Sequence, residues 1–147
     1  MSKDGRGRSG GKRKKKADRS SEVAAAPANE SASAPAPVSD GAVTITFLGG
    51  LGEIGRNCAC IEVEGKILLV DCGLMFPDLD MLGVDLVLPD FSYVRDNADR
   101  VIGCIATHGH EDHTGGLSFL LRELSFPIYG SPLTLGLARN RIEEAGL

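Results

Sequence analysis

The amino-acid sequence predicts an α/β fold with a largely buried sheet. Two observations carry this prediction. Short apolar runs rich in β-branched residues come first along the ordered part of the chain, and helical periodicity appears only after them. The resulting order is three strands followed by two strand–helix pairs, which is typical of the α/β class. With 147 residues the chain is long enough for one domain with its own core.

The predicted strands cover residues 43–48, 58–63, 66–70, 101–106 and 127–129. The first alternates apolar and polar residues, as a half-buried strand does. The third is apolar on both faces and stops at Asp71-Cys72-Gly73. A glycine-dense loop, residues 49–55, follows the first strand; because no helix comes after it, a tight turn is at least as good an interpretation as a phosphate-binding loop.

Two helices are expected in the second half of the chain. Residues 115–124 place leucines along one stripe, which indicates an amphipathic helix. Ser131 and Pro132 have the residue types of a helix N-cap and first helical position. Residues 74–90 lack periodicity and predict a long loop whose apolar side chains pack against the domain. The last helix barely closes before Leu147, so we expect residues 41–147 to be the N-terminal part of a larger, truncated domain.

Residues 1–40 form a tail of different composition. Residues 1–19 contain nine lysines and arginines against two aspartates, and an Ala/Pro/Ser-rich stretch follows. Neither part can bury enough apolar surface to offset the entropy of ordering, so the tail is predicted to be disordered. From residue 41 onward, seven basic residues face fifteen acidic ones. A basic arm on an acidic body favours binding of a polyanion, although a solubilising tail explains the arm equally well.

The four cysteines lie in or beside the predicted strands: Cys58, Cys60, Cys72 and Cys104. No secretory signal precedes them, so reduced thiols in the cytoplasm are expected. A zinc site from Cys58, Cys60 and Cys72 is one interpretation, and small buried apolar side chains are the better one. No apolar run approaches the roughly 20 residues that span a bilayer, so no membrane association is expected.

All three histidines of the chain fall within six residues, His108 to His113, directly after a buried strand. Side chains at the C-terminal end of a strand project into the cleft where α/β sheets bind their substrates and cofactors. Imidazoles suit zinc and a carboxylate adds a harder ligand. We therefore expect His108 and His110 to bind one ion, and Asp112 and His113, turned away from that pair, to bind a second. Solvated loop histidines are the much weaker alternative.

Two other carboxylates flank this cluster. Asp71 ends an apolar strand, where an ionised side chain needs a partner. It either supports a metal-bound histidine from behind or caps a turn. Glu111 has the right chemistry for proton transfer, but a solvent-facing loop carboxylate is the better interpretation.

The run His108–His113 resembles the HxHxDH motif of the metallo-β-lactamase superfamily, and Asp71 resembles its first-motif aspartate. The loops at residues 49–57, 73–78, 81–91 and 130–134 are similar to those of the ribonuclease J family, a β-CASP branch of RNA nucleases. The resemblance implies an αββα sandwich, of which this chain holds only the N-terminal part.

The same resemblance implies a function. The intact protein would be a zinc-dependent ribonuclease with 5′-to-3′ exonuclease and endonuclease activity in RNA maturation and decay. His108, His110, Asp112 and His113 would hold two Zn²⁺ ions, a metal-activated hydroxide would attack phosphorus, and Asp71 would be the supporting aspartate. The implied partners are RNA, further copies of the same protein in a homo-oligomer, and RNA-decay complexes. The chain by itself would be inactive. Alternatives are a small-molecule ester, thioester or lactam hydrolase, and an inert RNA-tethering fragment.

Overall fold

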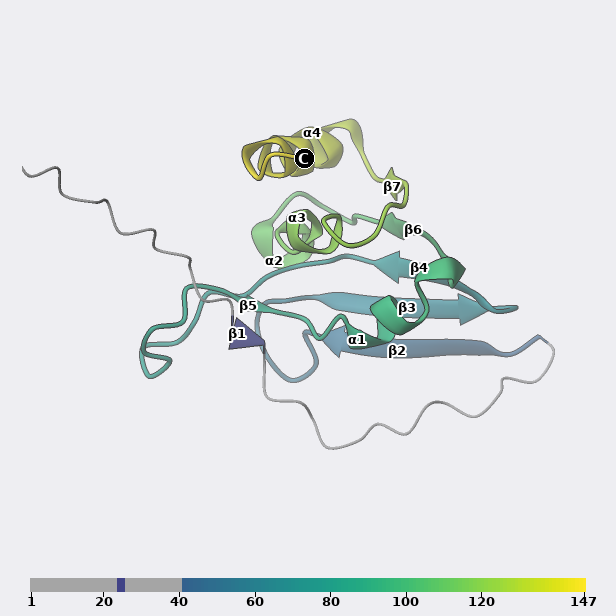
Figure 1. The fold of residues 1–147 in the computed structure, drawn as a ribbon, viewed down its shortest axis with the longest axis horizontal. Helices are drawn as coiled ribbons and strands as arrows, with labels where there is room; N and C mark the ends of the chain where they lie inside the picture. The colour runs from purple at the N-terminus through teal and green to yellow at the C-terminus, as the bar shows by residue number, and fades with distance from the viewer. Residues whose placement is uncertain (1–23, 26–40) are drawn as a thin grey trace, which may run out of the picture.

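The computed structural model describes residues 24–25 and 41–147. Within these ranges a five-stranded mixed sheet has the strand order β2-β3-β4-β6-β7 (Figure 1). The strands are β2 (Val43–Gly49), β3 (Cys58–Val63), β4 (Lys66–Val70), β6 (Val101–Ile105) and β7 (Ile128–Tyr129). The mixed α/β class expected from the sequence is confirmed, and so are the five strands, with ends that differ by one residue at most.

The sheet has an antiparallel part and a parallel part. β2, β3 and β4 pair antiparallel through short connections, whereas β4, β6 and β7 run parallel. Because parallel neighbours end at the same edge of a sheet, the C-terminal ends of β4 and β6 lie side by side, with Val70 paired to Ile105. That edge carries the residues singled out by their chemistry.

The two faces of the sheet differ in burial. One face packs against helices, and its core side chains are Cys60, Ile67, Leu69 and Cys104 from the strands, with Val94, Leu117 and Leu120 from the helices. On the other face, β2 presents Val43, Ile45 and Phe47, which are 60%, 56% and 57% exposed. The alternation in β2 is therefore present, but its apolar side is the exposed one.

The helices are α1 (Ser92–Asp96), η1 (Ala98–Arg100), α2 (Glu111–Thr114), α3 (Leu117–Leu120) and α4 (Pro132–Glu144). α4 begins as expected, with the Ser131 side chain accepting a hydrogen bond from the Thr134 backbone N–H. The single helix predicted over 115–124 is wrong in its bounds: helical structure begins at Glu111 and is interrupted at Gly115 and Gly116. The short helices α1 and η1 were not predicted.

The long segment between β4 and β6 is partly packed. Leu74, Val87 and Leu88 are buried, and Val87–Leu88 forms the short strand β5. Met75 and Val87 exchange backbone hydrogen bonds of 2.8 and 2.9 Å, which close the base of the loop. Its tip does not pack down as expected, since Leu79 and Leu82 are almost fully exposed.

The expectation of a disordered tail falls on residues outside the described part, apart from β1 (Ala24–Ala25), which pairs parallel with β5. In the described residues no helix is long and apolar enough to cross a membrane.

Candidate metal centre

The site begins where β4 and β6 end. Pairing of Val70 with Ile105 brings the next residues of both strands together, and the backbone N–H of Asp71 donates to the carbonyl of Ile105 at 2.8 Å. Asp71 is 6% exposed and has a φ of +58°. Such a backbone costs of order 1–3 kcal/mol for a residue other than glycine and clusters at functional sites. The surrounding contacts must offset this cost.

The Asp71 carboxylate faces three donor groups from two residues. Oδ1 accepts from the Thr107 backbone N–H (2.8 Å) and hydroxyl (3.0 Å). Oδ2 lies 2.8 Å from the same hydroxyl and 2.7 Å from His113 Nδ1. A carboxylate only accepts, so His113 carries its proton on Nδ1 and presents the lone pair of Nε2 on the other side of the ring. Asp71 therefore fixes both the tautomer and the direction of His113.

His113 Nε2 faces the carboxylate of Asp112, with 3.4 Å between Nε2 and Oδ2. Two ligand atoms that each lie about 2.0–2.1 Å from a tetrahedral zinc ion are about 3.3 Å apart. The spacing of this pair thus matches two ligands of one ion.

His108 lies against His113, and His110 lies against His108. The ring centroid of His108 is 3.9 Å from that of His113 and 4.7 Å from that of His110. His110 is the N-cap residue of α2, in extended backbone, and its side chain is exposed. The four candidate ligands therefore form one cluster, and the expected separation into two pairs turned away from each other is not seen in the ring positions.

The donor chemistry of this cluster fits metal ions: three imidazoles, one carboxylate, and a buried aspartate behind one of the imidazoles. Among the described residues, however, no three His, Cys, Asp or Glu side chains are already arranged around one point as an ion would need. Only the pair of His113 and Asp112 has ligand spacing in the described residues.

Two chain segments contact the backbone of the Asp112–His113 ligand segment. The Cys72 N–H donates to the His113 carbonyl (2.8 Å), and the Asn57 N–H donates to the Asp112 carbonyl (2.9 Å). A Cβ atom added to Gly73 would lie 1.7 Å from the Asp112 carbonyl oxygen, so only glycine allows this crossing. Asn57 and Thr107 are site residues that sequence reasoning missed. Thr107 directly precedes His108, and Asn57 ends the loop 49–57 that resembles the ribonuclease J family, but that resemblance gave neither residue a role.

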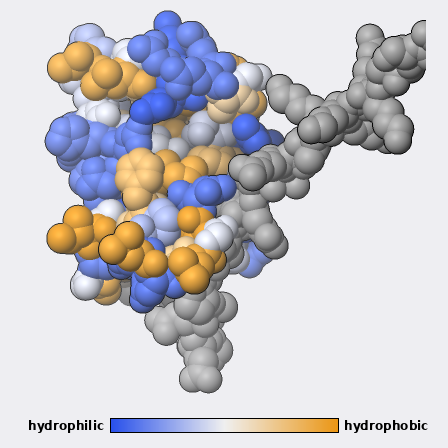
Figure 2. Space-filling model, turned by 90° about the vertical axis from the view of Figure 1, so that its left-hand side faces the viewer, coloured by the Kyte–Doolittle hydropathy of each residue, from blue (hydrophilic) through white to orange (hydrophobic). Residues whose placement is uncertain are grey.

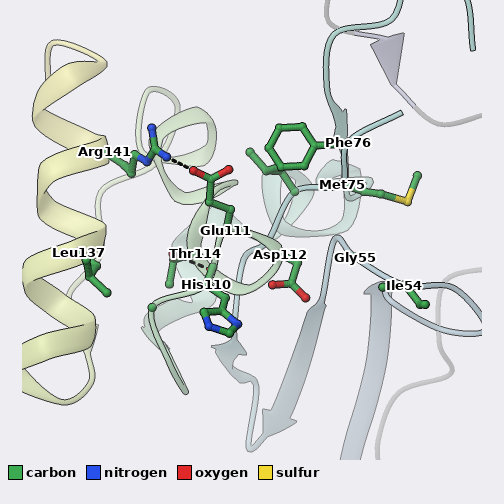
Figure 3. Close-up of a pocket in the computed structure, with 12 residues that line it drawn as sticks. Ile54, Gly55, Met75, Phe76, His110, Glu111, Asp112, Thr114, Leu137 and Arg141 are labelled. Atoms are coloured by element: carbon green, nitrogen blue, oxygen red, sulfur yellow. Dashed lines mark hydrogen bonds and ion pairs between the residues drawn. The ribbon is translucent and has the colours of Figure 1, made fainter. Parts of the chain in front are cut away.

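A hollow of about 670 Å³ opens beside the cluster, and Figure 3 shows His110 and Asp112 among the side chains that line it. Its apolar lining includes Ile54, Phe76 and Leu137. Figure 2 shows the end of the molecule at which β4 and β6 finish, where hydrophobic and hydrophilic surface lie side by side.

The Glu111 side chain is 34% exposed, as expected of a solvent-facing carboxylate, but the residue is helical and not in a loop. It lies in the first turn of α2 and forms an ion pair with Arg141 of α4 (Figure 3). Its role is to join the ligand segment to α4. Gly109 also contacts α4, because a Cβ at this position would meet the Leu137 side chain at 2.5 Å.

The four cysteines are free and buried. Burial raises the pKa of the Cys60 thiol to about 12, and a hydrogen bond with Cys58, followed by burial, raises the pKa of the Cys72 thiol. Among the described residues, no three His, Cys, Asp or Glu side chains, these cysteines included, are arranged around one point as a zinc ion would need. The structure favours their interpretation as small buried side chains over a cysteine zinc site.

The sequence model of the Metallo-beta-lactamase superfamily matches residues 51–145, well over half of the chain. The chain belongs to this superfamily. The match contains every candidate ligand and Asp71. This superfamily is metal-dependent.

Curated relatives of this chain support the narrower resemblance to ribonuclease J. It is 52% identical to ribonuclease J 1 of Streptococcus pyogenes over 105 residues, which are 71% of this chain and 19% of that protein. It is 48% identical to ribonuclease J of Helicobacter pylori over 109 residues, 74% of this chain and 16% of that protein. It is 49% identical to ribonuclease J2 of Bacillus subtilis over 104 residues, 71% and 19%. The chain thus spans less than a fifth of the length of these relatives.

Proposed function

We propose that the intact protein is a metal-dependent ribonuclease that hydrolyses RNA phosphodiesters. The observation that carries the proposal is the cluster at the shared end of β4 and β6. There Asp71 holds His113 at 2.7 Å, and Asp112 faces the same imidazole at ligand spacing. The similarity to ribonucleases of the J type supports RNA as the substrate.

In this proposal His108, His110, Asp112 and His113 would hold two zinc ions. When bound, the ions supply a water of lowered pKa and positive charge for the phosphate oxygens. Asp71 keeps the proton on His113 Nδ1, so that Nε2 remains a ligand throughout. Asp112 contributes a negatively charged ligand.

The hollow beside the cluster offers room for a substrate. Its apolar wall and the exposed ring of Phe76 suit the faces of nucleobases, because base–aromatic stacking tolerates any base. The similarity to ribonuclease J extends the proposal to four further properties. These are exonuclease and endonuclease action, self-assembly, association with RNA-decay complexes and a cytoplasmic location.

The test is a substrate comparison on the intact protein. RNA oligonucleotides with a 5′-monophosphate, a thioester and a β-lactam are incubated with zinc-loaded protein and with protein stripped by a chelator. We expect metal-dependent cleavage of RNA alone. Turnover of the thioester or lactam with no RNA cleavage would replace the proposal with a small-molecule hydrolase, and no turnover of any substrate would favour an inert RNA-tethering role.

A further inference from the structure

Asn57 connects the glycine loop to the candidate ligands. Its backbone N–H donates to the Asp112 carbonyl, and its carbonyl accepts from the Gly73 N–H, both at 2.9 Å. Its side-chain Nδ2 lies 3.1 Å from the Asp112 carbonyl oxygen, 3.2 Å from Asp112 Oδ2 and 3.2 Å from His113 Nε2. One amide group therefore contacts two neighbouring candidate ligands from a residue just before β3.

We propose that Asn57 is a positioning residue of the metal centre, whose side-chain amide holds the Asp112 carboxylate toward His113. The inference rests on the proposed function and adds a role for a residue outside the four ligands. Asn57 does not bind the ion in this account. It acts through Asp112.

The geometry gives the amide a specific task. The Asp112 side chain is 38% exposed, so water competes for its oxygens and the carboxylate can turn away. A carboxylate oxygen has two lone pairs, so Oδ2 can accept from Asn57 with one and face an ion with the other. Holding the carboxylate in place before the ion arrives lowers the entropic cost of binding.

The glycine loop in turn holds Asn57. A Cβ atom added to Gly50 would lie 2.6 Å from Asn57 Oδ1, so the amide oxygen packs directly on the loop backbone. Glu53 stabilises this loop by accepting from the Gly50 N–H at 3.0 Å and from Arg56 Nη2 at 2.9 Å. The two ends of the Asn57 amide therefore have different surroundings, with the oxygen toward the loop and the nitrogen toward the ligands. This packing gives the glycine loop a function other than binding phosphate.

A competing account makes the opposite prediction. Nδ2 lies at equal distance from Oδ2 and Nε2, so the amide could instead occupy space that an ion needs. Removing the amide would then strengthen metal binding. The sign of the change in affinity separates the two accounts.

The experiment measures zinc affinity of the intact, metal-free protein in competition with a chromophoric chelator. The variants are Asn57→Ala, Asn57→Ser and the control Asn97→Ala, whose amide donates to the Tyr93 carbonyl away from the site. Asn57→Ala can keep both backbone hydrogen bonds of the residue, and it removes the side-chain donor together with the amide oxygen that packs on the glycine loop. We expect about ten-fold weaker binding of one ion in Asn57→Ala, partial recovery in Asn57→Ser because its hydroxyl still donates, and no change in Asn97→Ala.

Unchanged or tighter zinc binding in Asn57→Ala would overturn the proposal. Equal losses of zinc affinity in Asn57→Ala and Asn57→Ser, with a matching fall in unfolding temperature, would also overturn it. That pattern would indicate a general loss of packing and not the loss of a hydrogen-bond donor. Failure of the proposed function looks different: wild-type protein would bind no zinc, or would bind it without cleaving RNA.

Discussion

Replacing Asp71 by asparagine isolates the support that this residue gives to His113. Asparagine tolerates the left-handed backbone that Asp71 adopts at a φ of +58°, so the main chain can stay in place. The side chain keeps its shape but has one acceptor oxygen where the carboxylate has two. The substitution therefore tests the second oxygen and the charge.

Neither orientation of the asparagine amide restores all the contacts. If its oxygen faces the Thr107 N–H, its NH2 group faces His113 Nδ1, and the proton of His113 must move to Nε2, which removes the lone pair for the metal. If its oxygen faces His113, the part-buried Thr107 N–H loses its acceptor at a cost of about 0.5–1.5 kcal/mol in unfolding free energy. Loss of a partner behind a ligand typically costs about 10–100-fold in metal affinity, or about 1.4–2.7 kcal/mol.

The assay combines zinc competition with urea unfolding of the metal-free protein. We expect at least one of the two quantities to fall by the stated amount in Asp71→Asn. Asp90→Asn is the matched control, because Asp90 accepts from the Ser92 N–H on the surface, away from the ligands. Wild-type values for both zinc affinity and unfolding free energy in Asp71→Asn would refute the assignment of Asp71 as the support of His113.

Three further predictions concern packing and the tail. Gly73→Ala places a Cβ against the backbone of the ligand segment and should lower the unfolding free energy, measured by urea titration, by about 1–3 kcal/mol or more. The control Gly136→Ala has open space around it in α4 and should be neutral or stabilising in the same titration. Leu117→Ala leaves a cavity at a fully buried position and should lower the unfolding free energy by about 2–5 kcal/mol. The control Leu133→Ala, at an exposed position, should change it by no more than about 0.5 kcal/mol. Equal effects would contradict the assignment of Leu117 to the core. Deleting residues 1–40 should weaken RNA binding mainly at low salt and flatten its salt dependence, measured by fluorescence anisotropy; an unchanged slope would return the tail to a solubilising role.

Local signals predicted most of the secondary structure. The β-branched run of β2, the turn between β3 and β4 and the Ser131–Pro132 start of α4 depend on neighbours in sequence, and all are found. The predicted helix over 115–124 failed because the leucine stripe does not mark where the first turn forms. That turn begins at Glu111, after His110 takes up extended backbone as its N-cap.

The composition of the site was also predictable, but its internal contacts were not. Three histidines at close spacing after a buried strand predict a candidate ligand segment without any structure. The 2.7 Å contact between Asp71 and His113 was one of two alternatives left open by sequence, and parallel pairing of β4 and β6 decides it. Asn57 reaches Asp112 across 55 residues, and such contacts leave no local pattern.

The central claim is that the histidine–aspartate cluster performs metal-dependent hydrolysis of RNA. The most direct measurement is single-turnover cleavage of a 5′-monophosphorylated RNA by the intact protein and its His110→Ala variant, with RNA affinity measured in parallel. The account predicts that cleavage by His110→Ala is abolished while RNA affinity stays close to that of the wild type. Cleavage by His110→Ala at the wild-type rate would contradict it.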